Sequence, residues 1–240
     1  MNRDSNVYTV LYAAVLVVIV AAALAVAAGA LKAPQEKNKE VEKKMNILTS
    51  VDKIHDVSKA DDKNTYIENE YKKYIVEAFL VDANGKRVEG DAFNMDLKAE
   101  LKKPERERLL PVFVCNDKGN KQYIIPVRGA GLWGAIWGYV ALNDDFSTVY
   151  GAVFDHAGET PGLGAEIALP EFQKQFSGKK IYRDGKFASV EVLKNGSAPL
   201  NDYNVDGITG GTITSKAVGK MIFDCLSNYT KFFDLQKQNN

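Results

Sequence analysis

Cysteine and histidine are scarce in this sequence: Cys115 and Cys225 are its only thiols, and His55 and His156 are its only imidazoles. Two cysteines outside any CxxC or CxxCH spacing exclude a disulfide framework, a cysteine zinc site and an attached haem. The histidines stand in no HxxxH or HExxH spacing, so we expect no metal, and we interpret His55 as a packing residue beside an apolar stripe.

The sequence also lacks an excess of charge of either sign, because 31 Lys and Arg residues balance 31 Asp and Glu residues. A formal net charge of zero gives no bulk attraction to nucleic acid, and we expect no nucleic-acid partner. Hydrolysis has no support either, since no GxSxG or metal motif accompanies the few histidines. Any function must therefore depend on a local site in an ordinary folded chain of 240 residues.

One long segment lacks charge altogether. Residues 5–31 carry no charged side chain, and residues 10–31 are hydrophobic or glycine throughout. As a helix, the latter run spans roughly 33 Å at about 1.5 Å per residue, enough to cross a hydrocarbon core of about 30 Å. The sequence predicts an N-terminal tail and transmembrane anchor over 1–31, in contact with the lipid bilayer through 10–31. A cleaved signal peptide is the alternative, but its apolar region is normally about 7–15 residues.

The remaining chain divides into a short polar segment and one domain. Residues 32–44 carry both signs of charge and suit a charged juxtamembrane linker or a helical extension of the anchor. Charges of both signs flank the anchor and encode no orientation. Residues 45–240 contain signals for strands and for helices, which predict one mixed α+β domain behind the anchor.

Three strand pairs and three helices make up this expectation. Turn residues separate 74–81 from the segment after Asn84-Gly85, 111–117 from 121–127, and 135–142 from 147–154. Within the second pair, Pro126 indicates a strand end or an edge strand. Apolar periodicity predicts helices over 46–59, 170–176 and 215–232.

Two glycine-rich segments are candidate sites with structural alternatives. Gly129, Gly131 and Gly134 match G-x-G-x-x-G, but strand residues follow where a dinucleotide-binding helix must begin, so we reject that reading. Trp133 and Trp137 there offer flat surfaces to a planar ring, or else belong to the sheet core. The loop over 155–166 would let the main chain touch a ligand, with Glu159 and Thr160 as polar handles, or it is an Ω-loop without one.

The third candidate covers 206–215, directly before the last predicted helix. A helix N-terminus with free N–H groups, glycines that permit close approach and the charge of Lys216 would suit a phosphate. The alternative is a simple helix cap by Ser215 or Thr214.

Two of these loops carry signatures of one family. Residues 206–212, DGITGGT, fit the D-x-x-[ST]-G-[AG]-T flavinylation signature, and residues 159–164, ETPGLG, are a second signature of the same FMN-binding domain. From anchor to final helix, the chain resembles the C subunit of the Na+-translocating NADH:quinone oxidoreductases. Gly211 departs from the alanine usual in that family, and the signature admits either residue. The resemblance places the FMN-binding region at about 125–232.

The resemblance implies that Thr212 carries FMN through a phosphoester on its hydroxyl, a phosphothreonyl-FMN, installed from FAD by a separate Mg2+-dependent flavin transferase. It implies that Asp206 helps present the motif to that enzyme, and that the last helix begins where the phosphate is held. The further residues implied in cofactor binding are Thr209, Gly210 and Gly211 in the first loop, Glu159, Thr160 and Leu163 in the second, and Trp133.

The function implied is that of an electron relay without acid or base catalytic residues, and without activity outside its complex. As one subunit of a membrane translocase, the chain would pass electrons that originate in NADH toward quinone, while the complex moves Na+ and other subunits bind NADH. Its single-pass anchor would lie in the bacterial inner membrane, with the domain on the periplasmic side. The alternatives are the G subunit of the Rnf ferredoxin:NAD oxidoreductase complex, which is usually shorter where this chain has 46–73, and a membrane-tethered, non-redox binding or scaffold protein.

Overall fold

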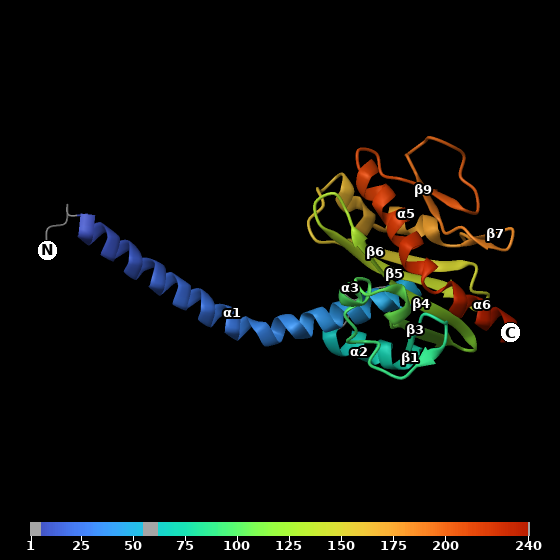
Figure 1. The fold of residues 1–240 in the computed structure, drawn as a ribbon, viewed down its shortest axis with the longest axis horizontal. Helices are drawn as coiled ribbons and strands as arrows, with labels where there is room; N and C mark the ends of the chain where they lie inside the picture. Colours follow the sequence, from blue (N-terminus) through green and yellow to red (C-terminus); the bar gives the residue numbers. More distant parts are fainter. Residues whose placement is uncertain (1–5, 55–61, 240) are drawn as a thin grey trace. The chain divides into compact units, whose positions relative to one another are not determined.

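The computed structural model describes residues 6–54 and 62–239 and divides the chain into two compact units, Met1–Lys43 and Lys44–Asn240. Helix α1 (Asn6–Ser50) contains the whole apolar run (Figure 1). Within the described ranges, it is the one helix long and apolar enough to cross a membrane. Residues 32–44 are helical as well, so the anchor continues as a helix instead of giving way to an irregular linker.

The end of α1 corrects the predicted helix over 46–59. Asp52 adopts a left-handed φ of 54°, and the Lys53 and Asp52 amides donate to the carbonyls of Leu48 and Thr49 at 2.9 and 3.0 Å. This bonding pattern is a Schellman motif, which closes a helix by satisfying its last carbonyls. The helix therefore ends at Ser50. Residues 55–59, His55 among them, lie outside the described residues.

Six strands form the main sheet of the second unit, and the three predicted strand pairs are confirmed. All neighbours within the sheet are antiparallel, in the order β2-β1-β3-β4-β5-β6. The strands are β1 (Ile75–Val81), β2 (Arg87–Val88), β3 (Leu110–Asp117), β4 (Asn120–Ala130), β5 (Ala135–Asn143) and β6 (Val149–His156).

Pro126 is predicted to lie at a strand end or in an edge strand, but it lies inside β4, a strand with neighbours on both sides. The ladder between β3 and β4 runs from Asp117–Asn120 only to Phe113–Ile124, whereas β5 pairs with β4 as far as Ala130. Beyond Ile124, β4 has a paired neighbour on one side only. A proline, which has no N–H to donate, is therefore tolerated there.

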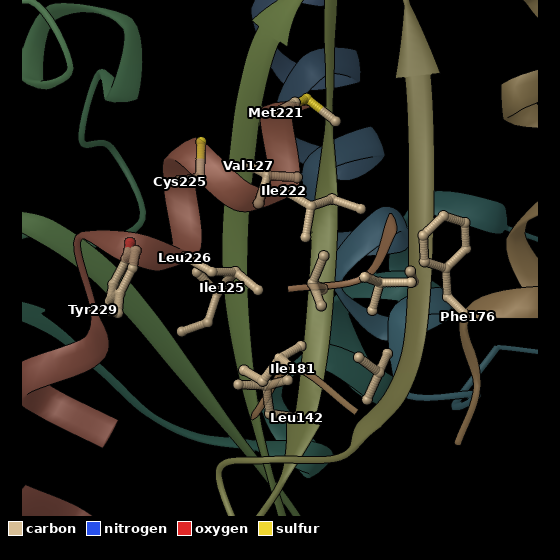
Figure 2. Packing of buried hydrophobic residues seen from close by; sticks show 14 of the residues in the cluster. Ile125, Val127, Leu142, Phe176, Ile181, Met221, Ile222, Cys225, Leu226 and Tyr229 are labelled. Atoms are coloured by element: carbon tan, nitrogen blue, oxygen red, sulfur yellow. The ribbon is translucent and has the colours of Figure 1, made fainter. Parts of the chain in front are cut away.

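The two C-terminal helices pack on one face of this sheet. Helix α5 (Thr212–Ser227) contacts β4, and α6 (Thr230–Asn239) follows it (Figure 1). Figure 2 shows Ile222 and Leu226 of α5 beside Val127 and Ile125 of β4. Phe232 and Phe233 of α6 are fully buried in the same cluster. Alternate residues of each strand point toward the helices, and on this face those residues are apolar.

The opposite face of the sheet packs against the start of the second unit. Ile47 and Val51, at the end of α1, are fully buried. They pack with Phe113, Cys115 and other strand residues whose side chains point to this face. Helix α2 (Lys63–Tyr74) adds Tyr71 and Tyr74 to this cluster. Both cysteines are free thiols. Cys115 belongs to this face and Cys225 to the face covered by α5 and α6, so the sheet separates them.

The predicted helix over 215–232 consists of two helices. Asn228 ends α5, and its side-chain amide donates to the Asp224 carbonyl at 2.6 Å, in competition with the helix backbone. The remaining short elements are α3 (Leu97–Glu100), η2 (Glu105–Glu107), η3 (Gly164–Ala168), α4 (Pro170–Gln173), η4 (Lys174–Phe176), the antiparallel pair β7 (Tyr182–Arg183) and β8 (Lys186–Phe187), and the parallel pair β9 (Glu191–Leu193) and β10 (Asn204–Asp206). The helical prediction over 170–176 corresponds to α4 and η4.

We expect Phe232→Ala to lower the free energy of unfolding by about 3–5 kcal/mol, the range for removing a buried aromatic ring. Phe232 is fully buried, and its ring lies 5.8 Å from Phe146 and 5.9 Å from Phe79 between ring centroids. Urea unfolding of the detergent-solubilised chain measures the change. Phe223→Ala is the control, because Phe223 is 47% exposed and its loss should cost less than about 1 kcal/mol. Equal effects of the two substitutions would contradict this assignment of the core.

Candidate functional site

Three segments far apart in the sequence meet at the N-terminus of α5. They are the turn over 131–134 between β4 and β5, the loop over 157–164 after β6, and the motif over 206–212. The Glu159 carboxylate accepts a hydrogen bond from the Trp133 amide at 2.8 Å and another from the Thr214 hydroxyl at 2.5 Å. Both signature loops and the tryptophan turn therefore belong to one site.

Glu159 is buried and ionised. Only 4% of its surface is exposed, and both carboxylate oxygens accept hydrogen bonds from the protein itself. Burial alone raises the pKa of this carboxyl, but bonds from the Thr214 hydroxyl and from the amides of Trp133, Leu132 and Gly134 outweigh it and hold the pKa below its usual range. The carboxylate is thus placed to organise the loops, and its oxygens are not directed to solvent.

Two glycines make room for this carboxylate. A Cβ on Gly131 would lie 2.5 Å from Glu159 Oε1, and a Cβ on Gly164 would lie 2.5 Å from both Glu159 Oε2 and Thr214 Oγ1. Gly164 is also the last residue of the ETPGLG signature. Gly164 therefore allows close packing around Glu159. Gly162, in the same loop, has a different role, because its φ of 73° gives a left-handed turn.

Helix α5 begins at Thr212, three residues before the predicted helix start at Ser215. Gly211 is its N-cap, and among the described residues no side chain caps it. The Ser215 hydroxyl donates to the Gly211 carbonyl at 2.8 Å and accepts from the Ile208 amide at 2.9 Å, so it braces the preceding turn. The cap by Ser215 or Thr214 is thus wrong. The N–H groups of the first turn are left for another acceptor, and an anion is the acceptor that the helix dipole favours.

The motif strand before α5 is held by amide side chains. Gln175 accepts from the Asp206 amide at 2.9 Å and donates to the Asp206 carbonyl at 3.3 Å, which reproduces the bonding of a neighbouring strand. The Asp206 carboxylate accepts from the Gly196 amide at 3.1 Å, and Asn195 donates to the Gly207 carbonyl at 3.1 Å. Asp206 is therefore half-buried and anchored to the turn over 193–197.

The surface around this helix start is apolar and accessible. Thr212 is half-buried, while Thr160, Thr209 and Gly210 are at least partly exposed. Gly210 has a left-handed φ of 76°, and a Cβ there would lie 2.6 Å from Leu163 Cδ2, so the second loop lies directly on the motif. The large apolar side chains exposed on the three segments are Leu132, Trp133 and Leu163, and Ile213 is exposed directly after the motif.

The two tryptophans differ in their surroundings. Trp133 is 71% exposed, so the interpretation of it as a core residue is wrong. Trp137 is half-buried in β5, with the Arg128 guanidinium 5.9 Å from the centre of its ring. Sequence reasoning missed Leu132 and Ile213 as exposed site residues and Thr214 as the partner of Glu159. The sequence offered a signal for Leu132, which adjoins Trp133, and for Ile213, which adjoins Thr212. It offered none for the contact of Thr214 with Glu159.

The residues present fit a phosphorylated planar cofactor. Uncapped N–H groups and close-packed glycines suit a phosphate, and the exposed Trp133, Leu132 and Leu163 suit an apolar ring. Thr212, whose side chain carries a hydroxyl, is the first residue of this helix. The site as described can hold and orient such a group. The buried Glu159 carboxylate at this site accepts hydrogen bonds from the protein itself.

Acid should destabilise the protein partly through Glu159. Because its folded-state pKa lies below the unfolded value, its stabilisation is present above about pH 4.3 and is lost as the pH falls through the folded pKa. We expect Glu159→Gln to reduce stability at pH 7 by about 1–3 kcal/mol and to flatten the loss of stability in acid. Urea midpoints measured between pH 3 and 7 test this. Parallel pH profiles of the two proteins would contradict it.

Comparison with known proteins gives a consistent result. The FMN-binding domain family matches residues 131–227. The C subunit of the Na(+)-translocating NADH-quinone reductase of Haemophilus ducreyi is 34% identical over 235 residues, covering 90% of this chain and 88% of the relative. That of Vibrio vulnificus is 32% identical, covering 72% and 74%.

Solved structures agree. A crystal structure of the C subunit of the Na(+)-translocating NADH-quinone reductase from Parabacteroides distasonis superposes with a TM-score of 0.76 at 45% identity, covering 85% of this chain and 96% of that one. The crystal structure of NqrC from Shewanella oneidensis gives a TM-score of 0.70 at 25% identity, covering 84% and 99%.

Proposed function

The chain belongs to the family of C subunits of the Na(+)-translocating NADH-quinone reductases, and we propose that Thr212 is the residue through which it carries covalent FMN. It is an electron-relay subunit of an oxidoreductase complex and contains an FMN-binding domain. One observation carries the proposal for Thr212. This residue, which bears a hydroxyl, is the first residue of a helix without a side-chain cap, and it is the last residue of a signature for flavin attachment.

The main chain around Thr212 would hold the phosphate. The first-turn amides of α5 present N–H groups, and the helix dipole favours negative charge there. Gly210 and Gly211 leave the approach open because they carry no side chain, although the Gly211 amide itself donates to the Ile208 carbonyl at 3.0 Å. A phosphoester to Thr212 retains one negative charge beside these amides. Thr209 adds a hydroxyl to the same loop. The attachment also keeps the cofactor from dissociating between turnovers.

The exposed side chains would receive the flavin ring. Trp133 and Leu163 offer exposed apolar surface, and Thr160 lies in the same loop as Leu163. FMN supplies reversible electron transfer when bound. The residues of this chain bind and orient it, and its exposed position suits exchange of electrons with other subunits. For Glu159, predicted as a flavin contact, the hydrogen bonds support a role in holding the loops.

Maturation and topology complete the proposal. A separate Mg2+-dependent flavin transferase would install FMN from FAD on the Thr212 hydroxyl, with AMP as the other product, and Asp206 would help present the motif. The single anchor over 10–31 would lie in the lipid bilayer of the bacterial inner membrane, with residues 45–240 on the periplasmic side. The other subunits of the complex would deliver electrons from NADH and pass them to quinone, coupled to Na+ movement.

Co-expression of the full chain with a flavin transferase tests the attachment. We expect in-gel flavin fluorescence that survives denaturation and a mass increase of one FMN, both absent when the transferase is omitted. A chain that stays unlabelled beside a labelled known acceptor would overturn the proposal and favour a non-redox scaffold. Isolation of the chain with ferredoxin:NAD oxidoreductase subunits would favour the Rnf alternative.

A further inference from the structure

We infer that Glu159 and Thr214 act together as positioning residues that fix the turn carrying Trp133 against the helical turn carrying Thr212. We call this pair the Glu159–Thr214 clasp. The role that we infer for it toward FMN rests on the proposed function. Its existence as a structural element depends only on the contacts within this chain. The two residues are 55 positions apart in the sequence and joined by a buried hydrogen bond of 2.5 Å.

The geometry of α5 separates the two threonines by role. Residues two positions apart in an α-helix point about 200° apart around its axis, so Thr212 and Thr214 face nearly opposite directions. Accordingly, Thr214 is 1% exposed and directed into the protein, while Thr212 is half-buried at the surface. A bond to Thr214 therefore holds the helix start from inside and does not involve the Thr212 hydroxyl.

The other end of the clasp fixes the tryptophan turn. Glu159 Oε1 accepts from the Trp133 amide at 2.8 Å, and the Gly131 amide donates to the Gly134 carbonyl at 2.7 Å to close the turn. Trp133 thus combines an anchored backbone with a side chain that is 71% exposed. The backbone of Trp133 is therefore held in place while its ring stays accessible to a ligand.

The clasp depends on the negative charge of Glu159. Within residues 6–54 and 62–239, Glu159 has no cationic partner, and its carboxylate is satisfied by N–H and O–H donors alone. The Glu159 amide in turn donates to His156 Nδ1 at 3.1 Å, which ties the loop back to β6. Hydrogen bonds to a charged acceptor are stronger than neutral ones, so loss of one donor should loosen the whole assembly.

The test compares wild-type chain with Thr214→Val and Thr214→Ser, each as the full chain. Valine removes the hydroxyl at nearly constant size, whereas serine keeps it. Without FMN, hydrogen exchange of the Trp133 amide should be roughly tenfold faster in Thr214→Val and close to wild type in Thr214→Ser. After labelling with FMN, the steady-state anisotropy of flavin fluorescence should fall in Thr214→Val and recover in Thr214→Ser.

The outcomes separate the clasp from the flavin proposal. Unchanged exchange and unchanged anisotropy in a folded Thr214→Val chain would overturn the clasp, as would equal loss in the serine variant. Flavin fluorescence on a denaturing gel reports attachment alone: failure in every chain would overturn the proposed function, and the exchange experiment would still decide on the clasp. If Thr214→Val does not fold, Glu159→Gln replaces it and should accelerate Trp133 exchange several-fold, with wild-type exchange contradicting the clasp.

Discussion

Thr212→Val will abolish covalent flavin attachment and reduce NADH-driven quinone reduction by the assembled complex to background. Valine has nearly the size and shape of threonine but lacks the hydroxyl that would form the phosphoester, so the helix start should keep its structure. Thr212 is half-buried, and no described side chain depends on its hydroxyl for a hydrogen bond. In-gel fluorescence after denaturation and the quinone-reduction rate of the purified complex measure the two effects.

Thr230→Val is the matched control for this substitution. Thr230 also begins a helix, α6, but lies outside both signatures, and its hydroxyl donates to the Ser227 carbonyl. We expect this variant to be labelled like the wild-type chain. If Thr212→Val is still labelled, the attachment lies elsewhere. If both variants lose the label, the assay responds to helix stability and not to the Thr212 hydroxyl.

Gly164→Ala will disrupt the site from within the second loop. The added Cβ would lie 2.5 Å from both Glu159 Oε2 and Thr214 Oγ1, a distance at which the carboxylate or the helix start must move. Overpacking of this kind costs about 1–3 kcal/mol, and here it also separates the two loops that flank Thr212. We expect a lower urea midpoint and strongly reduced flavin labelling.

Gly158→Ala controls for the change of glycine to alanine in the same loop. A Cβ on Gly158 meets nothing within 4 Å, and its φ lies outside the left-handed region. This variant should keep wild-type stability and labelling. If Gly164→Ala behaves like Gly158→Ala, the close packing of Gly164 against Glu159 and Thr214 is not required for the site.

The sheet was predictable because local signals determine it. Alternating apolar residues and tight turns such as Asn84-Gly85 specify strand pairs, and the structure has them in register. The breaks in the helices were less predictable. The Schellman motif after Ser50 depends on Asp52 in a left-handed conformation, and the break at Asn228 depends on a side chain that bonds to the helix backbone. Neither interrupts the apolar periodicity on which the prediction relied.

The site could be located from the sequence but not assembled from it. The two signatures identify 159–164 and 206–212, and the position of the second before a helix indicates an anion site. The contact between Glu159 and Thr214 has no local signal, because it joins residues that only the folded sheet brings together. The exposure of Trp133 was equally hidden, since an aromatic residue next to a strand is more often buried.

The relay function is tested most directly by the redox behaviour of this one flavin inside the complex. The absorbance difference between the wild-type complex and the Thr212→Val complex isolates it from other chromophores. Under anaerobic conditions, we predict that NADH bleaches this difference spectrum at a rate no slower than turnover and that added quinone restores it. A flavin that stays oxidised with NADH, or stays reduced when quinone is added, would contradict its role as a relay.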